Sequence, residues 1–339
     1  MTGRVRLSVV VVTFGSGAAL ERSLPPLLAQ LGEGDELVVV DNASDDDTLA
    51  RVRRLAPHAR LLAQERNLGF AAAANAGAAV AGGDLLVFLN PDAVVADGFA
   101  DAIRRPMERD WDAWMGVVTA GEALNTTGGI VHFTGIAWSG QVGEPPAAAP
   151  AEPREVAFAS GACLAVRRER WRELGGFSPE YFMYCEDVDL SLRVWLAGGR
   201  VGVEPAARVD HDYSFAKGDY KWRLLERNRA ATVLRTYPAP LLALLAPGLL
   251  ATELALLAIA PASGWGRPKL RAYADTLRAL PRLLRERRSI QTRRVIETRE
   301  FARLLTPDLS SPDLGPVARN PLLRTALRVY WAAVLSVVR

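Results

Sequence analysis

Buried strand-like runs alternate with helical segments in the first part of the chain, and this alternation limits the fold more than any other feature. The apolar runs lie within "LSVVVVTF", "DELVVVDNASDDDT", "RLLAQERNLGF" and "GDLLVFLNPDAVV". Helical segments separate them: "GSGAALERSLPPLLAQL", "TLARVRRLA" and "AAAANAGAAVA". Continuous β-branched and leucine-rich runs indicate strands that are buried on both faces. The sequence therefore predicts a doubly wound, mostly parallel α/β sheet.

Polar residues follow the predicted strands, at the edge where open parallel sheets bind their ligands. They are Thr13, Asp41, Asn42, Asn67, Asn90 and Asp92. The stretch "FGSGAAL" lacks the third glycine of the dinucleotide fingerprint, and no GxxxxGK[ST] stretch is present, which excludes a P-loop. We therefore expect a glycine-poor nucleotide site in which side chains hold the base and the ribose.

The stretch "YCEDVDLSLRVW" places three carboxylates, Glu186, Asp187 and Asp189, ahead of an apolar run. One interpretation is a helix N-terminus, where acids interact favourably with the helix dipole. Helical spacing separates the acids, however, because Asp187 shares a face with Leu190 at an offset of three. Asp187 is thus expected to face the core or a cleft. Asp189 pairs with Arg193 at i,i+4 and is expected to be solvated.

A histidine follows these acids at a distance that suits a divalent-metal site. His211 lies 24 residues after Asp187, and Asp92 ends the fourth predicted strand. A carboxylate and an imidazole suit Mn²⁺ or Mg²⁺ when a diphosphate supplies further oxygens. A carboxylate that is not a ligand can then serve as a general base. The alternative for each of these residues is a structural one, as a turn residue, a helix cap or a core histidine.

The C-terminal third changes in composition. "PAPLLALLAPGLLATELALLAIAPA" is apolar but interrupted by Pro247-Gly248, and we predict a broken pair of interfacial helices in place of one spanning helix. Residues 267–303 carry 12 basic and 4 acidic residues, a net +8 in a chain of net +3. An apolar anchor beside a basic segment is typical of proteins that bind an anionic membrane surface. The alternative is a helical hairpin packed on the body.

Two cysteines, Cys163 and Cys185, form no disulfide framework, and this suits a reducing compartment. The apolar run near the N-terminus is too short for a signal peptide, so none is expected. No nucleic-acid partner is expected either.

Six motifs in order resemble glycosyltransferase family 2, which has the GT-A fold. They are "VVVVTF", "VVVDNASDDDT", "RNLGFAAAANAG", "LLVFLNPDA", "ASGACLAVRRERWRELGGF" and "EDVDLSLR". Within the family, the chain most resembles bacterial rhamnosyltransferase-like enzymes of envelope polysaccharide synthesis. The resemblance covers about residues 6–235 and is specific for the family but weak for the sugar.

The resemblance implies a role for each candidate residue. The nucleotide would lie against Thr13, Phe14, Asp41, Asn67, Gly69 and Asn90. Asp41 corresponds to the acid that binds the pyrimidine base, and Asp92 and His211 correspond to ligands of Mn²⁺ or Mg²⁺. Asp187 corresponds to the base that deprotonates the acceptor hydroxyl. The chain departs from the family at Phe14-Gly15, where Tyr-Asn is usual, and at Asn90, where many relatives have an acid.

The resemblance also implies an activity. We expect an inverting glycosyltransferase that moves a sugar, with rhamnose the first candidate, from a dTDP- or UDP-sugar to a lipid-linked or glycan acceptor. We expect a catalytic domain over residues 1–235, with a nucleotide half at about 1–100 and an acceptor half at about 101–235. A helical, membrane-associating extension would follow over 236–339, placing the protein in the cytoplasm on the inner face of the plasma membrane. The alternatives are a nucleotidyltransferase on a related sheet and a non-catalytic scaffold that binds nucleotide-sugars.

Overall fold

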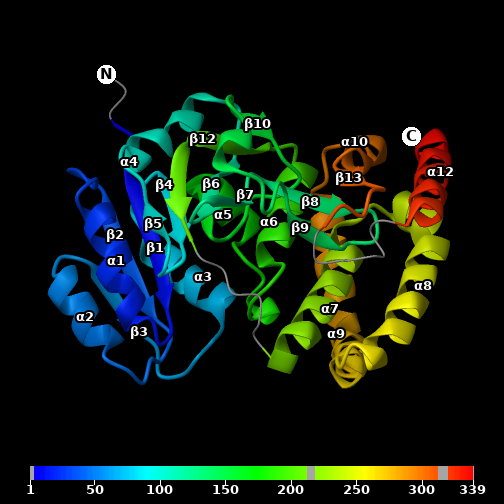
Figure 1. Ribbon diagram of the computed structural model, residues 1–339, viewed down its shortest axis with the longest axis horizontal. Helices are drawn as coiled ribbons and strands as arrows, with labels where there is room; N and C mark the ends of the chain where they lie inside the picture. Colours follow the sequence, from blue (N-terminus) through cyan, green and yellow to red (C-terminus); the bar gives the residue numbers. More distant parts are fainter. Residues whose placement is uncertain (1–3, 212–217, 312–319, 339) are drawn as a thin grey trace. The chain divides into compact units, whose positions relative to one another are not determined.

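The computed structural model describes residues 4–211, 218–311 and 320–338 (Figure 1). The chain divides into two compact units. The first unit comprises residues 1–128, 139–194 and 199–213, and the second comprises residues 129–138, 195–198 and 214–339. The sequence predicts a boundary near residue 235, whereas the compact units divide at residue 214, and two short internal segments belong to the same unit as the C-terminal helices.

The first unit is built on the predicted parallel sheet, and this prediction is confirmed. Strands β1 (Leu7–Thr13), β2 (Glu36–Asp41), β3 (Arg60–Ala63) and β4 (Leu85–Leu89) pair in parallel in the order β4-β1-β2-β3. Every residue of β1 and of β4 is buried. The register pairs Thr13 with Asp41, so the two strands end side by side.

The alanine-rich helix α3 (Phe70–Val80) packs against β1 and β2. Its small residues permit a close approach, since a Cβ on Gly77 would lie 2.5 Å from the Val10 side chain and 2.9 Å from that of Val40. Helices α1 (Gly17–Leu28) and α2 (Thr48–Leu55) pack together after the first two strands. The predicted strand and helix alternation is therefore the framework of this unit.

The other half of the sheet is mixed in direction. Strand β11 (Cys163–Arg167) runs antiparallel between β4 and β6 (Ala113–Ala120), and β12 (Val201–Asp210) runs parallel to β6. Strand β12 has 10 residues. An irregularity between Glu204 and Arg208 interrupts its pairing with β6.

Short strands and helices complete the first unit. They are β5 (Val94–Val95), α4 (Phe99–Ala102), η1 (Arg105–Glu108), β7 (Ala123–Thr126), η2 (Pro146–Ala148), β10 (Arg154–Glu155), α5 (Arg168–Leu174), η3 (Pro179–Tyr181) and α6 (Glu186–Leu196).

The second unit is mostly helical. It contains β8 (Gly129–His132), β9 (Ala137–Ser139), α7 (Gly218–Thr236), α8 (Ala239–Ala262), α9 (Gly266–Thr292), α10 (Thr298–Ala302), β13 (Leu305–Thr306) and α12 (Pro321–Val337). Helices α7 and α9 pack along each other, and β8 lies between β13 and β9 in a small sheet.

The predicted break in the apolar segment is wrong, because α8 is a single helix of 24 residues. A proline inside a helix removes the backbone hydrogen bond that its N–H would donate, and a side chain of α12 contacts the backbone of the neighbouring turn. The Tyr330 hydroxyl accepts from the Gly248 N–H at 3.3 Å and donates to the Leu244 carbonyl at 2.7 Å. By length and composition α8 could cross a membrane, and only 6% of its apolar window is buried.

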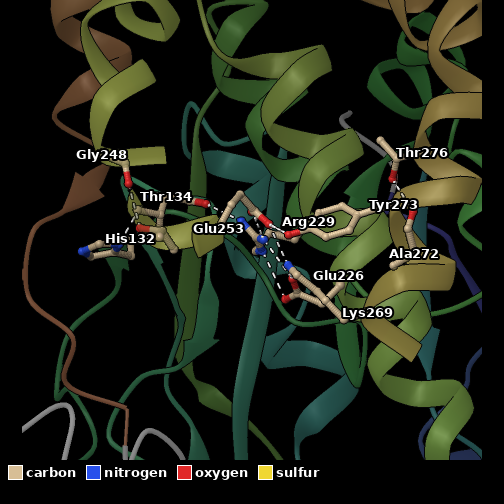
Figure 2. A network of polar contacts seen from close by, with 11 residues as sticks. His132, Thr134, Glu226, Arg229, Gly248, Glu253, Lys269, Ala272, Tyr273 and Thr276 are labelled. Carbon is tan, nitrogen blue, oxygen red and sulfur yellow. Dashed lines mark hydrogen bonds and ion pairs between the residues drawn. The ribbon is translucent and has the colours of Figure 1, made fainter. Parts of the chain in front are cut away.

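A network of charged side chains holds α8 against α7 and α9 (Figure 2). Glu253 of α8 accepts from Lys269 at 2.7 Å and from Tyr273 at 2.7 Å, and it also pairs with Arg229. Arg229 binds Glu226 at 2.9 Å, and Lys269 pairs with Glu226 as well. Burial raises the pKa of Glu253, but the Arg229 charge and the bonds from Lys269 outweigh it and lower that pKa to about 2. Four ionised groups therefore satisfy one another.

We predict that Lys269→Met destabilises the protein. Lys269 is 1% exposed, and its removal leaves Glu226 and Glu253 with one cation fewer in a buried setting. Breaking a buried ion pair in this way costs about 3–5 kcal/mol of unfolding free energy. Arg278→Met on the same helix is the matched control, because its side chain is 77% exposed and its ion pair with Asp275 lies at the surface. Urea titration of both variants measures the difference, and equal effects would contradict a special role for the network.

Candidate functional site

The carboxyl ends of β1 and β2 form the first part of the site. The Asp41 carboxylate accepts from the Thr13 hydroxyl at 2.8 Å, from the Ser44 hydroxyl at 2.5 Å and from the Ser44 N–H at 3.0 Å. Asp41 is 1% exposed and caps the turn after its strand, whereas Phe14 beside it is 57% exposed. The structure therefore presents an aromatic face and a buried carboxylate at one sheet edge, and exposed aromatic rings are suited to stack on a base.

Asn42 joins this edge to the loop before α3. Its side-chain amide donates to the Asn67 side chain at 2.8 Å, and its carbonyl oxygen accepts from the Leu68 N–H at 2.8 Å. The side-chain oxygen of Asn67 also accepts a hydrogen bond from the Gly69 N–H at 2.9 Å. The sequence predicts Asn42 at a strand end but does not place it in the nucleotide-binding set. Its position directly after Asp41 is the sequence signal for its place at this edge.

Gly69 is required by two independent constraints. Its φ of 81° lies in the left-handed region that favours glycine. A Cβ at this position would also lie 2.5 Å from the Phe182 carbonyl oxygen. The same oxygen accepts from the Ala71 N–H at 3.1 Å. The predicted nucleotide loop is thus in direct contact with the segment that precedes the acidic cluster.

Asn90, Asp92 and His211 meet at the end of β4. The His211 Nε2 lies 3.1 Å from an Asp92 oxygen and 3.0 Å from the Asn90 amide nitrogen. His211, the residue after β12, is thereby brought beside Asp92, which lies 119 positions earlier in the chain, and His211 is 4% exposed. Among the described residues, no group of three or more His, Cys, Asp or Glu side chains is placed so that it could hold a metal ion by itself.

These three side chains nevertheless fit a hard divalent cation. They offer a carboxylate oxygen, an imidazole nitrogen and, after rotation of its amide, an Asn oxygen. Mn²⁺ and Mg²⁺ accept such ligands when phosphate oxygens complete the coordination. Asp92 is also the accessible member, since its side chain is 46% exposed.

The acidic cluster begins α6, and its three carboxyl groups differ in their surroundings. The prediction that Asp189 is solvated is wrong, because Asp189 is 0% exposed. It binds Arg193 at 2.8 Å and accepts from the Tyr181 hydroxyl at 3.2 Å. Arg193 in turn donates to the carbonyls of Leu174 and Gly176 at 2.8 and 2.7 Å. The i,i+4 pair therefore anchors the helix inside the unit.

Asp187 is half-buried, and its carboxylate accepts hydrogen bonds from two backbone N–H groups. Gly161 donates to Oδ2 at 2.9 Å, and Val188 donates to Oδ1 at 2.8 Å. Burial raises the pKa of Asp187, and these N–H groups oppose the rise. The adjacent Ala162 carbonyl accepts from the Asn90 N–H at 3.2 Å, so one loop connects Asp187 to the predicted metal residues.

The backbone of residues 182–185, just before the acidic cluster, is conformationally strained. Phe182 has φ 65° and ψ −65°, and the Met183 N–H donates to the Tyr181 carbonyl at 2.7 Å. This geometry is the rare γ-turn with positive φ. Tyr184 and Cys185 also have φ values of 71° and 64°. Non-glycine residues in this region cost energy and cluster at functional sites, so the strain supports a functional role for the segment.

The chain is similar to glycosyltransferases of known function and structure. Residues 8–175 match glycosyl transferase family 2. The chain is 30% identical over 239 residues to the N-acetylglucosaminyl-diphospho-decaprenol L-rhamnosyltransferase of Mycobacterium tuberculosis, covering 62% of this chain and 78% of that protein.

Two solved structures share the fold. One is GalNAc-T7 with UDP, GalNAc and Mn²⁺, with a TM-score of 0.59, 19% identity, and coverage of 70% of this chain and 49% of that chain. The other is the mannosyltransferase PcManGT from Pyrobaculum calidifontis in complex with GDP-Man and Mn²⁺, with a TM-score of 0.51, 19% identity, and coverage of 98% and 86%. At this identity the two structures establish the fold alone.

The comparisons agree with the predicted motifs and with the parallel sheet that carries them. The M. tuberculosis relative is matched over most of its length at an identity that establishes the family. The chain therefore belongs to glycosyltransferase family 2, with a GT-A-like fold, and is a glycosyltransferase.

Proposed function

We propose that this enzyme is an inverting transferase that moves rhamnose from a dTDP-sugar to a lipid-linked acceptor. The observation that carries the proposal is the half-buried Asp187 carboxylate, which one loop connects to the cluster of Asn90, Asp92 and His211. The similarity to a rhamnosyltransferase named for a diphospho-decaprenol compound supports both the sugar and the acceptor class.

The donor would bind at the sheet edge described above. Phe14 and Asp41 would hold the pyrimidine base, and the loop of Asn67 and Gly69 would lie beside the base and ribose. Asp92 and His211, with Asn90, would hold the divalent cation. That cation, when bound, neutralises charge on the departing diphosphate. The solved neighbours that contain Mn²⁺ together with UDP or GDP-Man support this assignment.

The reaction would be a single displacement. The acceptor hydroxyl oxygen forms a bond to the anomeric carbon while the bond from that carbon to the diphosphate oxygen breaks. Asp187 accepts the hydroxyl proton, and the nucleoside diphosphate leaves with the bonding electron pair. The two backbone N–H groups fix the carboxylate before the acceptor arrives, so less orientational freedom is lost in the transition state.

The second unit supports binding to a membrane surface. Of the 14 large apolar side chains that are exposed among the described residues, 12 belong to this unit. Leu250, Leu254, Leu257 and Ile259 lie on α8. The network around Glu253 favours an interfacial position over a spanning one, because crossing the bilayer would separate buried charges from their partners.

Helix α9 adds a face that suits an anionic surface. Leu270, Leu277 and Leu284 are 59%, 69% and 50% exposed and recur every seven residues. An exposed arginine follows each leucine, at positions 271, 278 and 285. Residues seven apart share a helix face. The leucines could enter the headgroup region while the arginines meet lipid phosphates. Such an enzyme would act in the cytoplasm on the inner face of the plasma membrane.

Asp187→Asn should abolish glycosyl transfer while donor binding persists. The amide keeps the shape but cannot accept the proton, and general-base catalysis contributes about 10²–10⁴ in rate. Transfer from dTDP-rhamnose to a short-chain polyprenyl diphosphate sugar, with calorimetry of donor binding, measures both. Asp45→Asn, an exposed acid of the same unit, is the control. Transfer within tenfold of wild type would remove Asp187 from the base role.

His211→Ala should weaken Mn²⁺ binding in the presence of dTDP. The variant removes one of the proposed ligands and leaves Asp92 beside an empty space. The loss of free Mn²⁺ signal in electron paramagnetic resonance titrations reports binding without any turnover. His58→Ala is the control, because His58 is exposed. Unchanged Mn²⁺ affinity would assign His211 a structural role only.

Full-length protein should pellet with vesicles that contain anionic phospholipid. Replacing Arg271, Arg278 and Arg285 by Gln should weaken this binding by about 3 kcal/mol at low salt, since each cation contributes roughly 1 kcal/mol. Replacing the exposed Arg53, Arg105 and Arg172 by Gln is the matched control. High salt should release only part of the wild type, because the apolar share is not screened. If the protein stays in solution with both anionic and neutral vesicles, membrane binding is contradicted, and the helical hairpin packed on the body is the remaining interpretation.

A further inference from the structure

Three carboxyl groups lie within four positions at the start of α6, and each has a different set of partners. Asp189 has a cation, Arg193, and Asp187 has two backbone N–H donors. Glu186 is 7% exposed, and its Oε2 has no hydrogen-bond partner in the part of the chain that the structure describes. Within the same part of the chain, the backbone donor that acts on Glu186 is its own N–H. The first two groups have partners that favour the carboxylate form, whereas the Glu186 Oε2 has none there.

Burial without partners favours the neutral form of a carboxyl group, because an ionised group loses its hydration and gains nothing in return. Two adjacent carboxyl groups also disfavour double ionisation, so the protons are shared unequally according to the surroundings. Here the hydrogen bonds favour the proton on Glu186 and the charge on Asp187, since the Gly161 and Val188 N–H groups both donate to Asp187.

We propose that Glu186 is a positioning residue that holds a proton beside the catalytic base, so that Asp187 is the ionised member of the pair. The proposal rests on the proposed role of Asp187 as the base and extends it to the neighbour that sets its charge state. Glu186 acts through Asp187 and needs no contact with either substrate. A neutral Glu186 also keeps a second negative charge away from a site that must accept an anionic donor.

The electrostatics agree with this assignment. Burial, with the charge of Asp187 second, raises the pKa of Glu186 to about 8. Among the described residues, the charged groups that act on Glu186 are Asp187 and Asp189, and no cation opposes them. Arg193, the nearest cation along the helix, is engaged by Asp189 and by two backbone carbonyls. At neutral pH Glu186 is therefore protonated, and it ionises as the pH rises through about 8.

Infrared difference spectroscopy of the full-length protein tests the proton directly. The carbonyl stretch of a protonated carboxylic acid should be present at pH 7 and disappear with a midpoint near 8. Glu186→Gln should remove this band, and the exposed Glu173→Gln should not. In Asp187→Asn the band should remain with a lower midpoint, because the neighbouring charge that holds the proton on Glu186 is gone.

Activity supplies a second readout. The pH profile of kcat/KM for the donor should contain an ionisation near pH 8 in wild type, and Glu186→Gln should lack it. A wild-type spectrum with no such band at pH 7, or a band that Asp187→Asn removes at every pH, would overturn the proposal. Transfer that survives in Asp187→Asn while the Glu186 band behaves as expected would overturn the base assignment and leave the proton assignment intact.

Discussion

Parallel pairing of β1 with β2 and β4 is the constraint on which the site depends. Because the strands run in the same direction and in a register that matches Thr13 with Asp41, their polar ends meet at one edge. The hydrogen bond from Thr13 to Asp41 then holds this edge in place. The buried Val and Leu residues of β1 and β4 stabilise this edge, so Thr13 ends one fully buried strand and Asn90 follows another.

Hydrogen bonds and one close backbone contact connect the sheet edge to the segment that contains the acidic cluster. Asn42 holds the Asn67 loop, and Gly69 allows the Phe182 carbonyl to approach and accept from Ala71. On the other side, the loop of Gly161 and Ala162 binds Asp187 and the Asn90 backbone. The strained turn at Phe182 is thus over-determined by its neighbours, which is the condition under which such a conformation persists.

Charge has opposite uses in the two units. In the first, Glu186, whose Oε2 has no hydrogen-bond partner among the described residues, lies next to the proposed base in the sequence, and we propose that its neutral form sets the charge of that base. In the second, Glu253 and its partners are fully paired, and they hold a helix that is otherwise apolar and exposed. A buried carboxyl oxygen without a hydrogen-bond partner is costly in either place, so the contrast between Glu186 and Glu253 supports the functional role that we propose for Glu186.

The sequence by itself determined the parallel sheet, its polar edge and the family, because local apolar runs and short motifs decide these features. It also identified Asn90, Asp92 and His211 as candidates that the fold then brings together. Only the tertiary structure decided the burial of Asp189, since Tyr181 reaches it from outside its own helix and Arg193 is anchored by more distant carbonyls. The continuity of α8 past Pro247 could not be decided from the local sequence either, because the hydroxyl that binds the Gly248 N–H and the Leu244 carbonyl beside the proline comes from Tyr330, 82 residues after Gly248.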